Sequence, residues 1–180
     1  MFNTAKTAIG RKGPSVPARR FVEQIADRHV TGYTSVLDWG CGRGTDVEWF
    51  NHLGFDGRGY DPIFRPRVSY KNTRPKFEYI TCFYVLNVIP TKKGRVEAIK
   101  EAINHLADDG EMFIAVRAKR AIEYLSKNWK KHRDGYRTSK NTFQHGFTDE
   151  ELKKLVKSAG MCYTAWSMAG FVGAIATHRK

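Results

Sequence analysis

Apolar and polar positions follow two periods along the chain, one typical of helices and one typical of strands. Apolar side chains three and four apart predict helices over residues 17 to about 30, 45–53, 91–106 and 148–158. Short apolar or alternating runs predict strands at 35–38, 57–60, around 67–70, 77–83, 111–117, 161–168 and 171–178. Strands alternate with helices until a final hairpin, which predicts an α/β fold with a mainly parallel sheet of about seven strands, one of them antiparallel.

Two segments depart from this pattern. Residues 1–17 contain four glycines and prolines and predict an extended arm. Residues 118–147 combine helical spacing up to Lys131 with a polar loop that ends before a capping box at Thr148 and Glu151. Because there is no repeat and no second core pattern, we expect one domain over 1–180, with a basic arm at 1–17 and a basic insert at 118–147 on the substrate side.

The run VLDWGCGRGTD at 36–46 is the most informative motif of the chain. A strand, a glycine turn and a helix start form the βα unit in which a backbone approaches a nucleotide closely. Asp61 follows the second predicted strand, where a carboxylate can accept both hydroxyls of a ribose. These two signals predict a site for an adenosine-type cofactor.

The spacing of the glycines favours one cofactor over others. Dinucleotide sites prefer GxGxxG, whose helix start holds a pyrophosphate, whereas this turn reads GxGxG and follows an aspartate, Asp38. S-adenosylmethionine (SAM) has no phosphate; Asp38 can orient its amine and Asp61 can bind its ribose. We therefore predict SAM rather than NAD, with no metal, and a cofactor site formed by Asp38, Gly40, Cys41, Gly42, Asp61, Pro62, Cys82 and Phe83.

These motifs resemble those of the class I SAM-dependent methyltransferases. The acidic residue before GxGxG is similar to their first motif, GYDP to the second and FEYITCFYVLNVIP to the fourth, and the final hairpin matches their antiparallel seventh strand. The resemblance implies a Rossmann-like methyltransferase fold, here shortened around strand three, so that the usual acidic contact to the adenine has no obvious provider. The segments TAIGRKGPSVPAR, DWGCGRGTDV, GYDP, YVLNVIP and NTFQHGFT also resemble small bacterial and phage methyltransferases, including some associated with DNA phosphorothioation.

The fourth motif supplies the candidate catalytic residues, Tyr84 and Asn87. Tyr84 stands where nucleic-acid amine methyltransferases place Asp or Asn before Pro-Pro-Tyr or Pro-Pro-Trp, and neither tetrapeptide occurs here. Tyr84 either holds a substrate, contacts the sulfonium through its ring, or packs the strand edge. Asn87 is either catalytic or a turn residue. Cys82 lacks the preceding proline of cytosine-5 enzymes, which favours burial or an adenine contact over a nucleophile.

The candidate substrate residues lie near the carboxyl edge of the predicted sheet, where ligands gather in open α/β folds. Arg117 ends a strand there and can meet an anionic substrate. Phe143 and Gln144 are predicted to stack on and hydrogen-bond a base, and His145 is either a proton acceptor or a spectator.

Charge widens the list of partners. The formal net charge is +13; residues 1–20 carry five basic and no acidic side chains, and residues 117–140 carry nine basic side chains against Glu123 and Asp134. Clustered cations contact phosphates, so we expect DNA or RNA as a partner through segments 6–20 and 117–140. Segment 6–20 can instead fold over the cofactor or form a disordered tail. A basic surface that only maintains solubility is the alternative.

The sequence therefore predicts a SAM-dependent methyltransferase acting on a nucleic acid or another anionic substrate. A small-molecule methyltransferase, and a SAM-binding or nucleic-acid-binding module without transfer activity, remain open. No apolar run approaches the ~20 residues of a membrane span, and three widely spaced cysteines predict reduced thiols in a cytoplasmic protein. The oligomeric state is not predicted.

Overall fold

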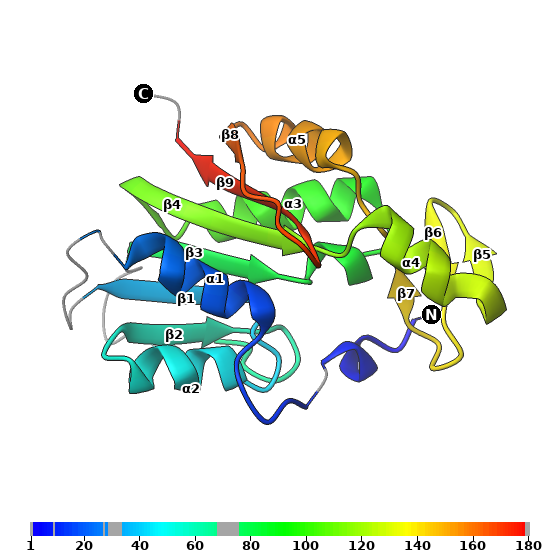
Figure 1. Ribbon diagram of the computed structural model, residues 1–180, viewed down its shortest axis with the longest axis horizontal. Coiled ribbons are helices and arrows are strands. Elements are labelled where there is room, and N and C mark those ends of the chain that lie inside the picture. Colours follow the sequence, from blue (N-terminus) through cyan, green and yellow to red (C-terminus); the bar gives the residue numbers. More distant parts are fainter. Residues whose placement is uncertain (1, 9, 27, 29–33, 68–75, 179–180) are drawn as a thin grey trace.

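The computed structural model describes residues 2–8, 10–26, 28, 34–67 and 76–178. Six strands form the main sheet in the order β2-β1-β3-β4-β9-β8, with β9 antiparallel to both of its neighbours and the other contacts parallel. The mainly parallel sheet with one antiparallel strand is confirmed (Figure 1). The strand expected around 67–70 lies almost wholly outside the described residues. The strands are β1 (Ser35–Trp39), β2 (Asp56–Tyr60), β3 (Phe77–Phe83), β4 (Leu106–Val116), β8 (Cys162–Ala165) and β9 (Val172–Thr177).

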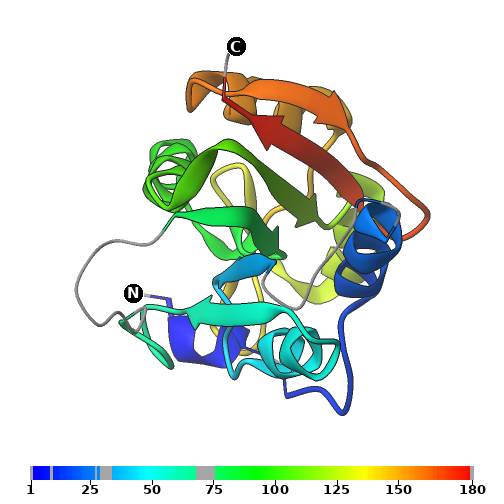
Figure 2. The same cartoon turned by 90° about the vertical axis from the view of Figure 1, so that its left-hand side faces the viewer.

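Helices cover both faces of this sheet (Figure 2). The helices α1 (Val16–Ile25) and α2 (Thr45–His52) lie on one face, and α3 (Lys92–Ile103) and α5 (Asp149–Ser158) lie on the other. Successive strand residues point to opposite faces, so the neighbours Val36 and Leu37 of β1 enter two different apolar clusters. A sheet buried on both faces explains the almost continuous apolar run of β3.

Most predicted elements are present, with shifted ends. The capping box is confirmed, because Thr148 Oγ1 accepts the Glu151 N–H and the Glu151 carboxylate accepts the Thr148 N–H. The helix expected to reach residue 106 ends at Ile103, because Leu106 already pairs with Phe77 at the start of β4. The register of β4 then shifts before Glu111, so the strand expected to begin at residue 111 begins at Leu106 with an irregular first part.

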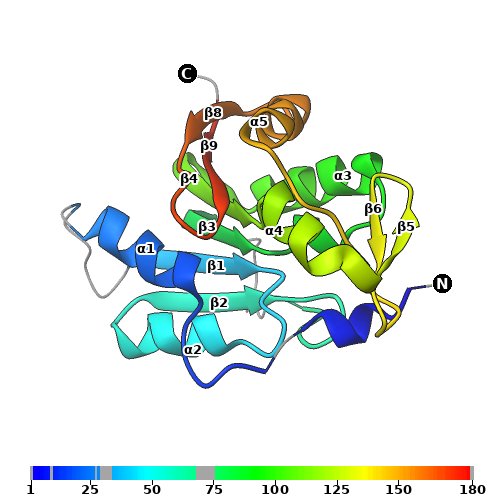
Figure 3. The same cartoon turned by 45° about the vertical axis from the view of Figure 1, so that its right-hand side comes forward.

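The segment after β4 differs most from expectation. Instead of one helix to Lys131 and a loop, it forms the short helix α4 (Lys119–Leu125), the 3-10 turn η3 (Ser126–Asn128) and an antiparallel sheet. We call this sheet the small sheet; its strands are β5 (Lys130–His132), β6 (Gly135–Arg137) and β7 (Phe143–Gln144). Figures 1 and 3 show it with α4 beyond the carboxyl ends of the parallel strands.

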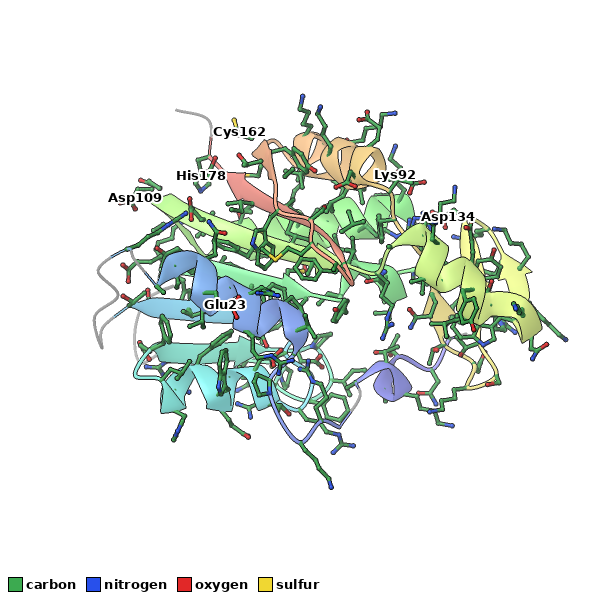
Figure 4. The ribbon with its side chains drawn as sticks, viewed as in Figure 1. Glu23, Lys92, Asp109, Asp134, Cys162 and His178 are labelled. Carbon is green, nitrogen blue, oxygen red and sulfur yellow. The ribbon has the colours of Figure 1, made fainter. Side chains whose placement is uncertain are left out.

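A buried arginine holds the small sheet to the body of the protein. The side chain of Arg95 in α3 is 2% exposed, and its guanidinium donates two hydrogen bonds to the Asp134 carboxylate, at 2.6 and 3.2 Å. Its Nε donates to the carbonyl of Ile89 at 2.9 Å. The guanidinium also lies 5.6 Å and 5.5 Å from the ring centres of Phe143 and Phe147. Figure 4 places Asp134 where the β5–β6 hairpin meets the start of α3, so one charge pair joins the two parts.

None of the helices in the described residues is both long and apolar enough to cross a membrane.

Candidate active site

The glycine-rich turn between β1 and α2 has the backbone geometry that its sequence predicts. Gly40, Gly42 and Gly44 adopt φ values of +83°, +54° and +87°, which residues with a side chain rarely adopt. The N–H groups of Gly40 and Cys41 donate to the carbonyl of Tyr60 at 2.7 and 2.9 Å. A Cβ at Gly40 would stand 2.3 Å from a methyl carbon of Val85. Glycine is therefore required here by protein packing as well as by backbone angle.

Asp61 connects the end of β2 to this turn. Its Oδ2 accepts the N–H of Gly42 at 3.1 Å, and its Oδ1 accepts those of Ile63 and Phe64 at 2.9 and 3.0 Å. A carboxylate has about four acceptor positions, so Oδ2 keeps capacity for a further donor. Asp61 is only partly buried, and its neighbour Pro62 is exposed. The two motifs predicted to share one cofactor thus meet in space.

Asp38 is a buried carboxyl group at the end of β1. Its side chain accepts a hydrogen bond from Thr81 Oγ1 at 2.9 Å. Burial, and next the negative charge of Asp46, raise the pKa of Asp38 to about 7, although the positive charge of Arg11 acts in the opposite direction. The site therefore holds a carboxyl group whose charge changes near neutral pH.

The N-terminal arm is fastened beside this carboxyl by Asp46, which is 3% exposed. Asp46 accepts hydrogen bonds from the N–H of Ser15 at 2.7 Å, from its hydroxyl at 2.9 Å and from the Arg11 guanidinium at 2.9 Å. The Cβ of Ala8 lies 3.1 Å from the point where a Cβ of Gly42 would stand. The arm therefore crosses the glycine-rich turn instead of extending away from it.

The other end of the arm lies on the small sheet. The Phe2 ring packs edge-on against those of His132 and Phe143, with centroids 5.0 and 5.6 Å apart. The Asn3 N–H donates to the carbonyl of Asn141 at 2.9 Å, next to the 3-10 turn η1 (Thr4–Thr7). The arm thus connects the small sheet to the glycine-rich turn at the carboxyl edge of the main sheet.

Tyr84 follows β3 in a strained conformation. Its φ is +62°, which is costly for an aromatic residue, and its N–H donates to the carbonyl of Ala115 at 2.7 Å. The guanidinium of Arg117 lies 5.4 Å from the centre of the Tyr84 ring. Burial raises the pKa of Tyr84, so its phenol stays protonated at neutral pH. The structure brings these two predicted residues together at the carboxyl edge of the sheet.

Asn87 holds backbone in place, which differs from its predicted catalytic role. It is 1% exposed; its Oδ1 accepts the N–H of Arg117 at 3.1 Å and its Nδ2 donates to the carbonyl of His145 at 2.6 Å. Because both amide atoms have backbone partners, Asn87 fixes the segments that carry Tyr84 and Arg117. We assign it a positioning role.

The predicted base-binding segment is also largely buried. Phe143 is 1% exposed beneath Phe2, so its ring has no free face for a base. His145 is 6% exposed, and its Nδ1 lies 2.6 Å from the carbonyl oxygen of Asp134. Burial, and next the charge of Arg95, lower the pKa of His145. Only Gln144 is partly exposed, and its Oε1 is buried without a hydrogen-bond partner.

The cysteines near the turn are protonated thiols. Burial raises the pKa of Cys41 to about 12 and that of Cys82 further above its usual range. A protonated buried thiol is a poor nucleophile, which agrees with the expectation for Cys82. Phe83 packs near Trp166, with ring centroids 6.1 Å apart. Within the described part of the chain, no group of histidine, cysteine and acidic side chains is arranged to hold a metal.

Asp46 is a site residue that the sequence does not reveal, whereas Arg11 and Ser15 lie in the segment 6–20 that can fold over the cofactor. Asp46 stands in the first turn of α2, where an acidic residue is ordinarily explained by the helix dipole. Its partners lie 31 and 35 residues away in the arm. The sequence contains one indication of this contact, which is a basic arm with a serine together with an acidic residue, Asp46, directly after the glycines.

Asp38 gives the protein a testable pH dependence. Its pKa of about 7 exceeds its usual value of 3.8, so the folded state keeps a proton that the unfolded chain releases. The contribution of Asp38 to stability is therefore full below about pH 4 and lost as the pH rises through about 7, at about 1.4 kcal/mol per pH unit. Urea unfolding at pH 5 and 8 should show this loss in the wild type and not in Asp38→Asn. An equal pH dependence of the two proteins would contradict the assignment.

The sequence and the structure were compared with those of known proteins, and the matches are methyltransferases. The sequence model for the methyltransferase domain matches residues 11–164. The sugar N-methyltransferase KedS8 from Streptoalloteichus sp. is 14% identical, with a TM-score of 0.70 over 94% of this chain and 89% of that one. A SAM-dependent methyltransferase from Clostridium acetobutylicum is 12% identical, with a TM-score of 0.62 over 97% and 94%. Another from Methanosarcina mazei is 16% identical, with a TM-score of 0.64 over 87% and 98%. No curated protein sequence matches. At these identities the solved structures establish the shared fold.

Proposed function

This chain belongs to the methyltransferase domain family, and from that premise we propose that it transfers a methyl group from SAM to a nucleic acid or another anionic acceptor. The observation that carries the proposal is the meeting of the glycine-rich turn with Asp61, beside the buried Asp38 and next to Tyr84. The basic segments 6–20 and 117–140 favour a nucleic acid as the acceptor.

The residues around the turn fit SAM better than a dinucleotide. The first turn of α2, where a pyrophosphate would bind, carries Asp46 and Glu48, and Asp38 lies close by. The charge of Asp46 is balanced by Arg11, but Glu48 and the ionised form of Asp38 would repel a phosphate and attract the amine and the sulfonium of SAM. Asp61 Oδ2 would accept a hydrogen bond from a ribose hydroxyl. Arg11, which is one-third exposed, would hold the carboxylate of the methionine portion.

SAM, when bound, supplies an electrophilic methyl group. The role of the chain is then to align the acceptor with that group and to exclude water, since an in-line displacement depends mainly on geometry. The Tyr84 ring would face the sulfonium or the acceptor, and its protonated phenol can donate a hydrogen bond. Arg117 would hold an anionic group of the acceptor beside that ring.

A small-molecule acceptor is the second candidate. It is favoured by the likeness to a sugar N-methyltransferase over 94% of this chain. In that case the cations of segment 117–140 would only keep the protein soluble. The same active-site residues serve both candidates, so the acceptor must be identified by experiment.

A labelling experiment tests the proposed function. The protein is incubated with methyl-tritiated SAM and, separately, total RNA, total DNA and a small-molecule extract, with Asp61→Ala as the inactive control. We expect label in a nucleic-acid fraction that depends on intact Asp61 and declines as salt is raised, because salt weakens phosphate contacts. Label only in the small-molecule extract would establish the second candidate. Label in no fraction, with SAM binding intact, would indicate a binding module without transfer activity.

A further inference from the structure

The small sheet carries a surface pocket that the proposed methyl transfer does not use. Its volume is about 300 Å³. It opens between η3, the paired strands β5 and β6, and the loop that leads to β7. The lining residues are Asn128, Lys130, Arg137, Thr138, Ser139 and Asn141.

Two cations line this pocket side by side. Lys130 and Arg137 are directly opposed partners in the antiparallel β5–β6 pair, so their side chains project from the same face. No carboxylate forms an ion pair with either of them in the part of the chain that the structure describes. Two like charges held together without a counterion favour an anion between them.

The nearby acidic residues do not neutralise these charges. Segment 117–140 contains only Glu123 and Asp134 as acidic residues, and Asp134 is already paired with the buried Arg95. The hydroxyl of Ser139 and the amide of Asn128 add neutral hydrogen-bonding groups at the pocket. This combination of cations and neutral donors is suited to the oxygens of a phosphate group.

An exposed aromatic ring precedes the pocket residues in the chain. Tyr124 in α4 is 73% exposed and lies four residues before Asn128, and the ammonium of Lys127 is 5.0 Å from its ring centre. Lys127 occupies one face of this ring, and the opposite face can stack on an unpaired nucleobase of a strand whose phosphate enters the pocket. Bases in a duplex are already stacked, so such a ring selects single strands.

We propose that this pocket binds a backbone phosphate of single-stranded nucleic acid while Tyr124 stacks on one of its bases. The proposal rests on the proposed function, since it names the acceptor class of the same enzyme. The small sheet is rigidly joined to the active site, because the His145 N–H donates to the carbonyl of Asn87 at 2.8 Å. Figure 3 shows the small sheet beyond the carboxyl ends of the parallel strands, and Tyr84 follows the carboxyl end of β3.

Binding of a short fluorescein-labelled single-stranded oligonucleotide, followed by anisotropy at several salt concentrations, tests the phosphate site. The variant Lys130→Gln/Arg137→Gln should raise Kd about tenfold or more and lower the salt slope by about one for each cation that no longer meets a phosphate. The control Lys100→Gln/Lys157→Gln removes the same charge from exposed positions on α3 and α5 and should change Kd less than about twofold. Equal effects of the two variants would overturn the proposal.

Arg137 also lies 5.1 Å from the Phe2 ring centre, so its replacement can disturb the arm. Lys130→Gln alone avoids this contact and should still weaken oligonucleotide binding severalfold while leaving SAM affinity unchanged. Tyr124→Ala should weaken oligonucleotide binding about tenfold, and Tyr124→Phe should retain it, because stacking needs the ring and not the hydroxyl.

The remaining outcomes separate the sources of the phosphate. Inorganic phosphate should compete only weakly with the labelled oligonucleotide. If it competes as strongly as an unlabelled oligonucleotide, and if Tyr124→Ala has no effect, the pocket is a site for free phosphate and the proposal is overturned. Stronger binding of duplex than of single strands would also overturn it. If the variants behave as expected but the oligonucleotide is not methylated, the nucleic-acid binding site is confirmed and the proposal that nucleic acid is the methyl acceptor is wrong.

Discussion

Replacing Asp61 with alanine should raise the Kd for SAM about thirtyfold. Oδ2 of the carboxylate keeps one acceptor position for a ribose hydroxyl, and one charge-assisted hydrogen bond accounts for about 2 kcal/mol. Isothermal titration calorimetry with SAM measures this loss. Unchanged affinity would remove the main support for the cofactor site.

The controls for Asp61 separate cofactor binding from loop structure. Asp61 also accepts three backbone N–H groups, so the alanine variant should unfold at a lower temperature in addition to losing SAM. Asp61→Asn keeps one acceptor oxygen for the loop and should still bind SAM poorly. Asp56→Ala removes the same charge from the same strand, breaks only an exposed pair with Arg58 and should bind SAM normally.

Replacing Asp134 with alanine should lower the free energy of unfolding by about 2 kcal/mol, which is less than for a fully buried pair because the Asp134 side chain is 43% exposed. Burial alone would raise the pKa of Asp134, but its hydrogen bonds and charge interaction with Arg95 lower it, which shows a favourable pair. Without Asp134 the charged Arg95 guanidinium, 2% exposed, would lose its carboxylate partner and keep only the Ile89 carbonyl and two aromatic rings. Urea unfolding followed by circular dichroism gives the change in stability.

Glu123→Ala is the matched control, because it removes an exposed carboxylate from the same basic segment. Its unfolding free energy should stay within about 0.5 kcal/mol of the wild type. If both variants lose the same stability, the cause is the net charge of the segment and not the buried pair. The separation between these outcomes is large compared with the error of the measurement.

The sequence predicts best what short-range patterns determine. The bounds of β3 coincide with the predicted run 77–83, because a strand buried on both faces needs apolar residues throughout. The glycine-rich turn and Asp61 were found together because their chemistry requires particular residue types at particular spacings. Nothing in those patterns depends on residues far away in the chain.

The small sheet was missed because long-range contacts hold it in place. Its strands contain two or three residues each, too few for a period to be seen. Arg95 and Asp134, which fasten it, are 39 residues apart. The sequence predicts that Phe143 and His145 face a substrate because their loop precedes the capped helix at the carboxyl edge, but Phe2 and Arg95 cover Phe143, and Phe147 packs against His145. The burial of these two residues therefore comes from contacts distant in the chain or from the following residues, which no local pattern shows.

The arm that crosses the glycine-rich turn is held at two ends of unequal strength. At one end a buried carboxylate accepts three hydrogen bonds, and at the other an aromatic ring and one backbone hydrogen bond rest on the small sheet. If the arm must lift for the spent, demethylated cofactor to depart, the Phe2 end will detach first. We therefore expect each round of catalysis to include one such opening, and the speed of that opening to set an upper limit on the turnover rate.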